Sequence, residues 1–287
     1  MAVNKNPRRR FIGALAAFIA LFCSCERSAA RRLIQAEVEA QNPPETLYVS
    51  GTTGTDAYTR RLDAALDAAG IPEDMGSRIK AAGEDVFLPE LMAAMEGDPF
   101  LWRLVDKKHA LPDSYEPADL VVLDNGGSYR VGRTGLRLRQ QAAESLEQMA
   151  RAARAEGITL TASSSYRSFD YQTEVYKRNV RESGQEIADR ESSRPGYSQH
   201  QLGLAVDFGS ITNAFAETVA GRWLLANGPK YGWSLSFPDG YEQLTGYRWE
   251  SWHYRYTGTV LAAFIDKWFG GIQQYALQFI HAWQNNG

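Results

Sequence analysis

The sequence predicts an α+β fold: a small, mainly antiparallel sheet flanked by helices, with a helical N-terminal extension. The chain of 287 residues is 44% hydrophobic and 23% charged, the composition of a globular protein. Apolar residues follow helical spacing within 56–96, 136–157 and 214–228. Helices and strands follow one another along the chain with short connections, which favours this fold class. Runs typical of strands lie at 119–124, 158–167, 204–208, 232–238 and 252–256.

The first 25 residues have the pattern of an export signal. A basic leader precedes an apolar run at 11–22, which is shorter than the ~20 residues that a membrane-spanning helix needs. The run ends beside Cys23 and Cys25, the only cysteines of the chain. The segment resembles a bacterial lipoprotein signal, although Phe22 and Cys23 depart from the usual lipobox. We therefore expect an exported protein on the periplasmic or cell-surface side, anchored to the membrane by a lipid on Cys25.

Residues 26–104 are predicted to be a linker followed by a helical extension. The linker, 26–45, is polar and ends in "QNPPE". Helical patterns follow at 59–70 and 88–97, with a break at Gly70-Ile71-Pro72. The remaining residues, 105–287, are predicted to form one domain that ends in helices.

The first elements of this domain alternate between strand and helix. "DLVVLD" at 119–124 is a strand that ends at an Asn-Gly-Gly turn. The helix predicted over 136–157 has Leu138, Leu146 and Met149 on one face and stops at Gly157. Apolar and polar residues alternate at the start of the run 158–167, with Ile158, Leu160 and Ala162 on one face, which predicts a strand.

Ser168 can cap the next helix, and the strand 204–208 follows it. The helix 214–228 closes at Asn227-Gly228, before two last strands. The apolar tail at 261–283 predicts two helices that pack on the domain. A membrane-surface helix is the alternative, but the tail lacks the basic face that would favour one.

Charge and cysteine content restrict the possible partners and metal ligands. A net charge of −3, from 31 basic and 34 acidic residues, gives no reason to expect binding to nucleic acid. After cleavage before Cys25 no free thiol remains to bind a metal. Any metal site must therefore consist of histidine and carboxylate groups.

His200 and Asp207 are the first candidates for such a site. An isolated histidine beside a strand is usually structural. Asp207, however, lies within the strand 204–208, between Val206 and Phe208, where a buried carboxylate needs a partner or a metal. Asp207 and Ala205 would share the face opposite to the apolar one.

The stretch "YRWESWHYRY" at 247–256 supplies two more candidates, Glu250 and His253. On a regular strand they would point to opposite faces, so both can serve one site only if Glu250 lies in the turn before the strand. Trp249 and Trp252 could give the site a partly dry wall, or the stretch could be a Trp-rich edge strand with a surface glutamate. His109 lies in a loop and His281 in a C-terminal helix, and neither is expected to be a metal ligand.

Together these residues provide two imidazoles, one carboxylate and a separate glutamate. Two histidines and one aspartate leave a zinc ion one open position for water, as a hydrolytic site requires. Glu250 could then accept a proton from that water. Arg167, at a strand end, could bind a carboxylate or an oxyanion, or could simply pair with Asp170.

Three motifs in order resemble the VanY-type D-alanyl-D-alanine carboxypeptidases of the M15 zinc peptidases (M15B-like). They are "SSYRSFDYQ" at 164–172, the pattern SxHxxGxAxD from Ser198 to Asp207, and "WESWHYRY" at 249–256. "LPDSYEPADLVVL" at 111–123 also resembles that family, and the likeness covers roughly residues 105–275.

The resemblance implies a Hedgehog/DD-peptidase-like fold and zinc-dependent hydrolysis of the terminal D-Ala-D-Ala bond of peptidoglycan stem peptides. It implies that zinc is held by His200, Asp207 and His253, with Glu250 as general base and Arg167 on the scissile carbonyl or the terminal carboxylate. Ser198, Gln172 and Tyr166 would position the substrate.

Two alternatives stay open. One is L,D-carboxypeptidase or endopeptidase activity at the same site, because cleft shape decides specificity. The other is a zinc-containing protein that binds cell-wall peptides without cutting them, against which the presence of Glu250 and Arg167 argues. The chain is expected to act as a monomer.

Overall fold

The computed structural model describes residues 52–286, and the residues from Thr52 onward form one compact unit. Predictions for the export signal, Cys25 and the linker at 26–45 lie outside this range. Among the described residues no helix has the length and apolar character needed to cross a membrane.

A five-stranded sheet carries the site, with strand order β2-β4-β5-β7-β6. β2 pairs in parallel with β4, and every other neighbouring pair is antiparallel, so the predicted mainly antiparallel sheet is confirmed. The strands are β2 (Arg130–Val131), β4 (Thr161–Ser164), β5 (Ala205–Phe208), β7 (His253–Tyr256) and β6 (Trp233–Leu235).

A separate two-stranded sheet modifies two predictions. The run at 119–124 forms β1 (Leu120–Val122), which pairs antiparallel with β3 (Arg137–Arg139) instead of joining the main sheet. The helix predicted over 136–157 therefore begins only at α5 (Gln140–Ala155), because its first residues are used in that pairing. β2 was not predicted, since two residues are too short to show a period.

The apolar side of the sheet packs against helices. Leu204, Val206 and Phe208 are fully buried in one core cluster with Leu146 and Met149 of α5, as the alternation along 204–208 predicts. The helix predicted over 214–228 is divided into η2 (Asn213–Glu217) and α8 (Val219–Asn227). The Thr218 hydroxyl caps α8 by accepting from the backbone N–H of Gly221 at 2.9 Å.

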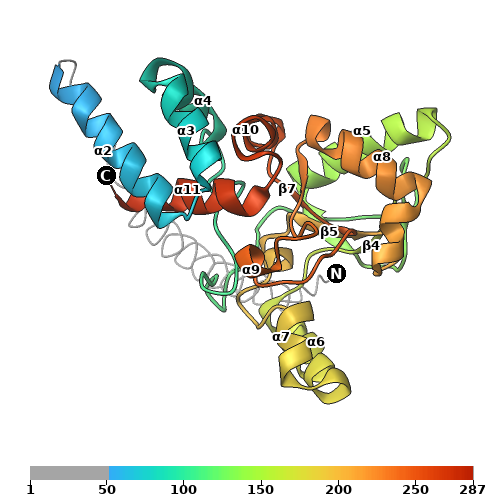
Figure 1. Cartoon of the computed structure of the whole chain (residues 1–287). Coiled ribbons are helices and arrows are strands. Elements are labelled where there is room, and N and C mark those ends of the chain that lie inside the picture. The colour runs from blue at the N-terminus through green and yellow to red at the C-terminus, as the bar shows by residue number, and fades with distance from the viewer. Residues whose placement is uncertain (1–51, 287) are drawn as a thin grey trace, which may run out of the picture. The chain divides into compact units, whose positions relative to one another are not determined.

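A second core joins the two ends of the described chain. The predicted helical extension consists of α2 (Thr52–Ala68), α3 (Glu73–Ala82) and α4 (Glu84–Ala94), and the apolar tail forms α10 (Thr259–Phe269) and α11 (Gln273–Asn285). These five helices lie together on one side of the sheet (Figure 1) and share one cluster of buried side chains. The tail therefore packs on the domain as predicted.

The remaining helices connect the strands. α6 (Phe169–Ser183) and α7 (Gln185–Glu191) project away from the five-helix layer (Figure 1). Ser168 caps α6, as predicted, by accepting from the backbone N–H of Tyr171 at 3.2 Å. The short helices η1 (Gln199–Leu202), η3 (Gly228–Tyr231) and α9 (Glu242–Thr245) lie in the loops around β5, β6 and β7.

Candidate metal centre

Three short elements bring the candidate ligands together. His200 lies on η1, whose N-terminus is capped by Ser198, and Gly203 ends that turn in the left-handed conformation at φ 68°. This reversal leads the chain directly into β5, which carries Asp207. Asp207 is paired with His253 in the antiparallel register of β5 and β7. The turn at Gly203 and this register therefore place all three side chains on one face.

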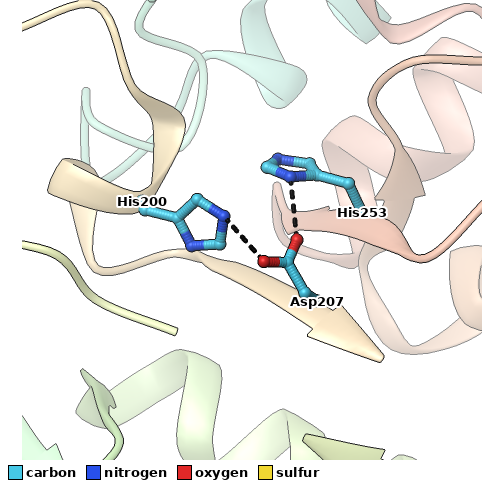
Figure 2. Close-up of side chains that lie close together, drawn as sticks. All are labelled: His200, Asp207 and His253. Carbon is cyan, nitrogen blue, oxygen red and sulfur yellow. Dashed lines mark ion pairs between the residues drawn. The ribbon is translucent and has the colours of Figure 1, made fainter. Parts of the chain in front are cut away.

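The ligand atoms converge (Figure 2). Nε2 of His200 lies 3.3 Å from Oδ2 of Asp207, and Nδ1 of His253 lies 3.1 Å from Oδ1. One ligand atom of each residue lies within 4.8 Å of the others, and all three residues are buried. Within residues 52–286 this is the one group of histidine, cysteine and carboxylate side chains with that geometry.

Hydrogen bonds fix which ring nitrogen carries hydrogen. Nδ1 of His200 lies 2.8 Å from the Ser165 carbonyl, which can only accept, so Nδ1 donates and Nε2 keeps its lone pair. Nε2 of His253 lies 3.2 Å from Oε1 of Gln199, which leaves the lone pair of Nδ1 pointing at Asp207. Oδ1 of Asp207 is buried without a hydrogen bond. Lone pairs that converge in this way fit a cation, and two imidazoles with one carboxylate suit zinc.

The charges of the three residues are those of metal ligands. Burial, helped by the charge of Arg167, lowers the pKa of His200 to about 4, so its imidazole is neutral near pH 7. Burial alone would raise the pKa of Asp207, but His200, His253 and Arg167 outweigh it and hold that pKa well below its ordinary value. Neutral imidazole and ionised carboxylate are the forms that bind a metal.

Glu250 lies in the turn before β7, where the sequence requires it to be if it serves the same site. Its backbone N–H donates to the Phe237 carbonyl at 3.0 Å, and Oε2 lies 3.6 Å from Nδ1 of His253. Burial, with the charge of Asp207, raises the pKa of Glu250 to about 8. A buried carboxyl whose pKa is near neutrality is suited to proton transfer.

Arg167 pairs with Asp207, not with Asp170. Its Nη2 donates to Oδ2 of Asp207 at 2.8 Å, and Nε and Nη2 donate to the Ser164 hydroxyl at 3.1 and 2.9 Å. Nη1 lies 3.4 Å from Oε1 of Gln172. β4 ends at Ser164, so Arg167 lies three residues beyond the strand and not at its end as predicted, and the Ser164 hydroxyl holds its guanidinium at the edge of the site.

The three predicted substrate-positioning residues make mainly internal contacts. Gln172 is fully buried and donates to the Ser193 carbonyl at 2.7 Å, besides accepting from Arg167. Ser198 caps η1 by accepting from the backbone N–H of His200 at 3.3 Å. The Tyr166 ring packs against Arg137, whose guanidinium carbon lies 4.9 Å from the ring centroid. Their roles toward substrate stay predictions.

One of the two residues predicted to form an aromatic wall, Trp252, does not contribute to it, whereas nothing in the structure tests the other, Trp249. Trp252 lies in the core on the apolar side of the sheet, because it precedes His253 by one residue and the strand period turns it away. Phe237 lies beside the candidate ligand, with its ring centroid 4.8 Å from that of His253 and 4.5 Å from that of Tyr247. An aromatic residue 16 positions before His253 carries no local signal of such a contact.

Comparison with known proteins gives a consistent set of relatives. Residues 135–259 match the family model described as VanY, D-alanyl-D-alanine carboxypeptidase. The chain is 39% identical over 169 residues to the putative carboxypeptidase YodJ of Bacillus subtilis, covering 57% of this chain and 62% of the relative. It is 32% identical over 184 residues to a D-alanyl-D-alanine carboxypeptidase of Enterococcus faecalis, covering 60% and 65%. The chain thus spans less than two thirds of the length of these curated relatives.

Solved structures show the same fold. The structure of the LdcB LD-carboxypeptidase has 34% sequence identity and a TM-score of 0.53, covering 59% of this chain and 85% of that one. A variant of the D,D-pentapeptidase VanY, in complex with Zn(II), has 28% identity and a TM-score of 0.52, covering 62% and 99%.

Proposed function

Because the chain belongs to the VanY family of D-alanyl-D-alanine carboxypeptidases, which are zinc metallopeptidases, we propose that it hydrolyses the terminal D-Ala-D-Ala bond of peptidoglycan stem peptides outside the cytoplasm. The observation that carries the proposal is the convergence of His200, Asp207 and His253 beside a buried glutamate.

His200, Asp207 and His253 would hold the zinc ion. Zinc bound there supplies Lewis acidity, which lowers the pKa of a water molecule and polarises a carbonyl group. The hydrogen bonds from His200 to Ser165 and from His253 to Gln199 orient both rings for this task.

Glu250 moves the proton. As a carboxylate it accepts a proton from the attacking water, and as a carboxylic acid it donates that proton to the nitrogen of the departing D-alanine. Its burial removes competing water, and a cation at the neighbouring ligands would favour its ionised form.

Arg167 binds negative charge in this scheme. Two of its nitrogens are held by Ser164, which fixes the guanidinium plane at the edge of the site. It would donate hydrogen bonds to the developing oxyanion or to the terminal carboxylate. Ser198, Gln172 and Tyr166 are proposed to position the substrate, Gln172 through its contact with Arg167.

Mass spectrometry of a purified pentapeptide stem tests the proposal. The zinc-loaded chain is expected to remove one alanine, and the Glu250→Gln variant to keep its zinc and lose about 10²–10⁴-fold in rate. Cleavage of a tetrapeptide stem or a cross-linked stem in place of the pentapeptide would assign the chain the L,D-carboxypeptidase or endopeptidase activity. Zinc binding with every substrate intact would favour the non-catalytic binding protein.

We further propose that the chain is a monomer held at the membrane by a lipid on Cys25. Fatty-acid labelling and fractionation of cells that express the wild type or the Cys25→Ala variant test this. Label and membrane association should both disappear with the substitution. An unlabelled wild type would contradict the anchor without affecting the enzymatic proposal.

A further inference from the structure

A chain of buried hydrogen bonds joins the C-terminal helix α11 to the candidate ligand His253. Gln273, the first residue of α11, contacts Gln199 on η1, and Gln199 contacts the His253 ring. The exposed fractions of the three residues are 1%, 4% and 5%. Gln273 lies beyond residues 135–259, the region that matches the family model.

The direction of these hydrogen bonds is set at one end by a backbone carbonyl. The Ser234 carbonyl can only accept, and Nε2 of Gln273 donates to it at 3.2 Å. The other end of the Gln273 amide, Oε1, therefore faces Gln199. It accepts from Nε2 of Gln199 at 3.3 Å.

The same reasoning carries the direction on to the metal ligand. With its Nε2 facing Gln273, Gln199 presents Oε1 to Nε2 of His253 at 3.2 Å. Oε1 can only accept, so Nε2 of His253 must carry the hydrogen. The lone pair of His253 is thereby left on Nδ1, 3.1 Å from Asp207.

Ser236 reinforces this arrangement. Its hydroxyl lies 2.7 Å from Oε1 of Gln199 and donates to it, so that this oxygen accepts two hydrogen bonds. If the Gln199 amide were reversed, its NH₂ group would face the His253 ring and its oxygen would face Oε1 of Gln273. That reversal places two acceptors together in a buried site, which is unfavourable.

We propose that Gln273 is a positioning residue that, through Gln199, sets the tautomer of His253 so that Nδ1 is free to bind the metal. The inference rests on the metal site of the proposed function. It assigns to a residue of the C-terminal helix, outside the matched region, an influence through Gln199 on a candidate metal ligand within that region.

The Gln273→Met variant tests the proposal, with Gln274→Met as its matched control. Gln274 is the next residue on the same helix turn and is equally buried, but its amide donates to Asp106 at 2.8 Å, not to Gln199. Both variants lose one buried amide, so they should lose similar stability in thermal unfolding. Only Gln273→Met should weaken zinc binding, by about 10–100-fold in a competition titration with a chelator.

Nitrogen NMR of the metal-free protein reads the tautomer directly, since the full chain has only four histidines to assign. In the wild type and in Gln274→Met, His253 should carry its hydrogen on Nε2. In Gln273→Met a second population should appear in which Nε2 carries no hydrogen and only Nδ1, which faces Asp207, is protonated. Unchanged tautomer and zinc affinity in a folded Gln273→Met protein would overturn the proposal, as would equal loss of affinity in the control.

A rescue experiment separates positioning from general packing. Adding Gln199→Glu to Gln273→Met places a carboxylate beside His253, and a carboxylate can only accept. The double variant should regain the Nε2–H tautomer and most of the zinc affinity, whereas a packing defect would persist. A wild type that binds zinc but cleaves no stem peptide would refute the proposed function alone, and the tautomer measurement in the metal-free protein would still decide this inference.

Discussion

Replacing Gly203 with alanine tests how the turn between η1 and β5 builds the site. Gly203 has φ 68°, and a Cβ there would lie 2.9 Å from Cγ of Arg139, 3.0 Å from Cδ2 of Leu120 and 3.1 Å from Cγ of Pro117. The left-handed conformation costs an L-residue about 1–2 kcal/mol. Overpacking in a filled space costs a further ~1–3 kcal/mol.

Gly157→Ala is the matched control. Gly157 has φ 77° after α5, and a Cβ there would meet nothing within 4 Å. The Gly157→Ala variant therefore has the cost of the left-handed conformation but no steric clash of the new Cβ. The difference between the two variants in unfolding free energy should be about 1–3 kcal/mol, which for a chain of this size is a difference in Tm of roughly 2–4 °C per kcal/mol.

The assay combines urea unfolding with zinc titration. Gly203→Ala should also weaken zinc binding, because relief of the clash moves η1 and His200 away from Asp207, whereas Gly157→Ala should bind zinc normally. Equal destabilisation by the two substitutions, with unchanged zinc affinity in both, would refute the argument that close packing at this turn fixes the ligands.

Three further predictions concern stability. Adding a chelator to the zinc-loaded protein should lower its Tm, since free zinc at 100-fold its Kd stabilises the folded state by ~2.7 kcal/mol; an unchanged Tm would argue against zinc at this site. Burial raises the pKa of Glu250 from its ordinary 4.5 to about 8, so between these values the folded metal-free chain holds a proton that the unfolded chain has released. Its unfolding free energy should therefore fall as pH rises across this window, and urea titrations of Glu250→Gln at several pH values should lack that component. Arg255→Met should destabilise the protein by ~1–3 kcal/mol in urea unfolding: the carbonyls of Phe100, Leu101 and Arg103 lose their buried donor, Nη2, and removal of the unpartnered Nε and Nη1 offsets part of that loss. An unchanged unfolding free energy would mean that water replaces the guanidinium.

The convergence of the candidate ligands His200, Asp207 and His253 could be predicted from the sequence, because the signals that mark these residues lie in short stretches of it. Asp207 interrupts an apolar strand, and the spacing of Glu250 and His253 demands a turn before a strand, which is what the structure contains. The contact of Phe237 with His253 and the separate sheet of β1 and β3 could not be predicted in the same way. They depend on which strand pairs with which, and no short period in the sequence records that choice.

The hydrogen bonds that connect His253 through Gln199 to Gln273 could not be predicted from the sequence either. Gln199 and Gln273 are 74 residues apart, and a glutamine gives no local signal that its amide is buried and oriented. Their role becomes visible only when the donors and acceptors of a packed site are counted one by one.

The shared core of the two chain ends has a consequence for the order in which the protein can fold. During synthesis α2, α3 and α4 are made first, yet α10 and α11, with which their apolar faces pack, are made last. Contacts between such distant segments close large loops and form slowly. The apolar faces of α2, α3 and α4 therefore stay partly exposed until α10 and α11 have been synthesised. Since α11 also brings Gln273 to its place behind His253, the ability to bind metal should appear only at the end of folding, so that incomplete chains are inactive and vulnerable to proteolysis.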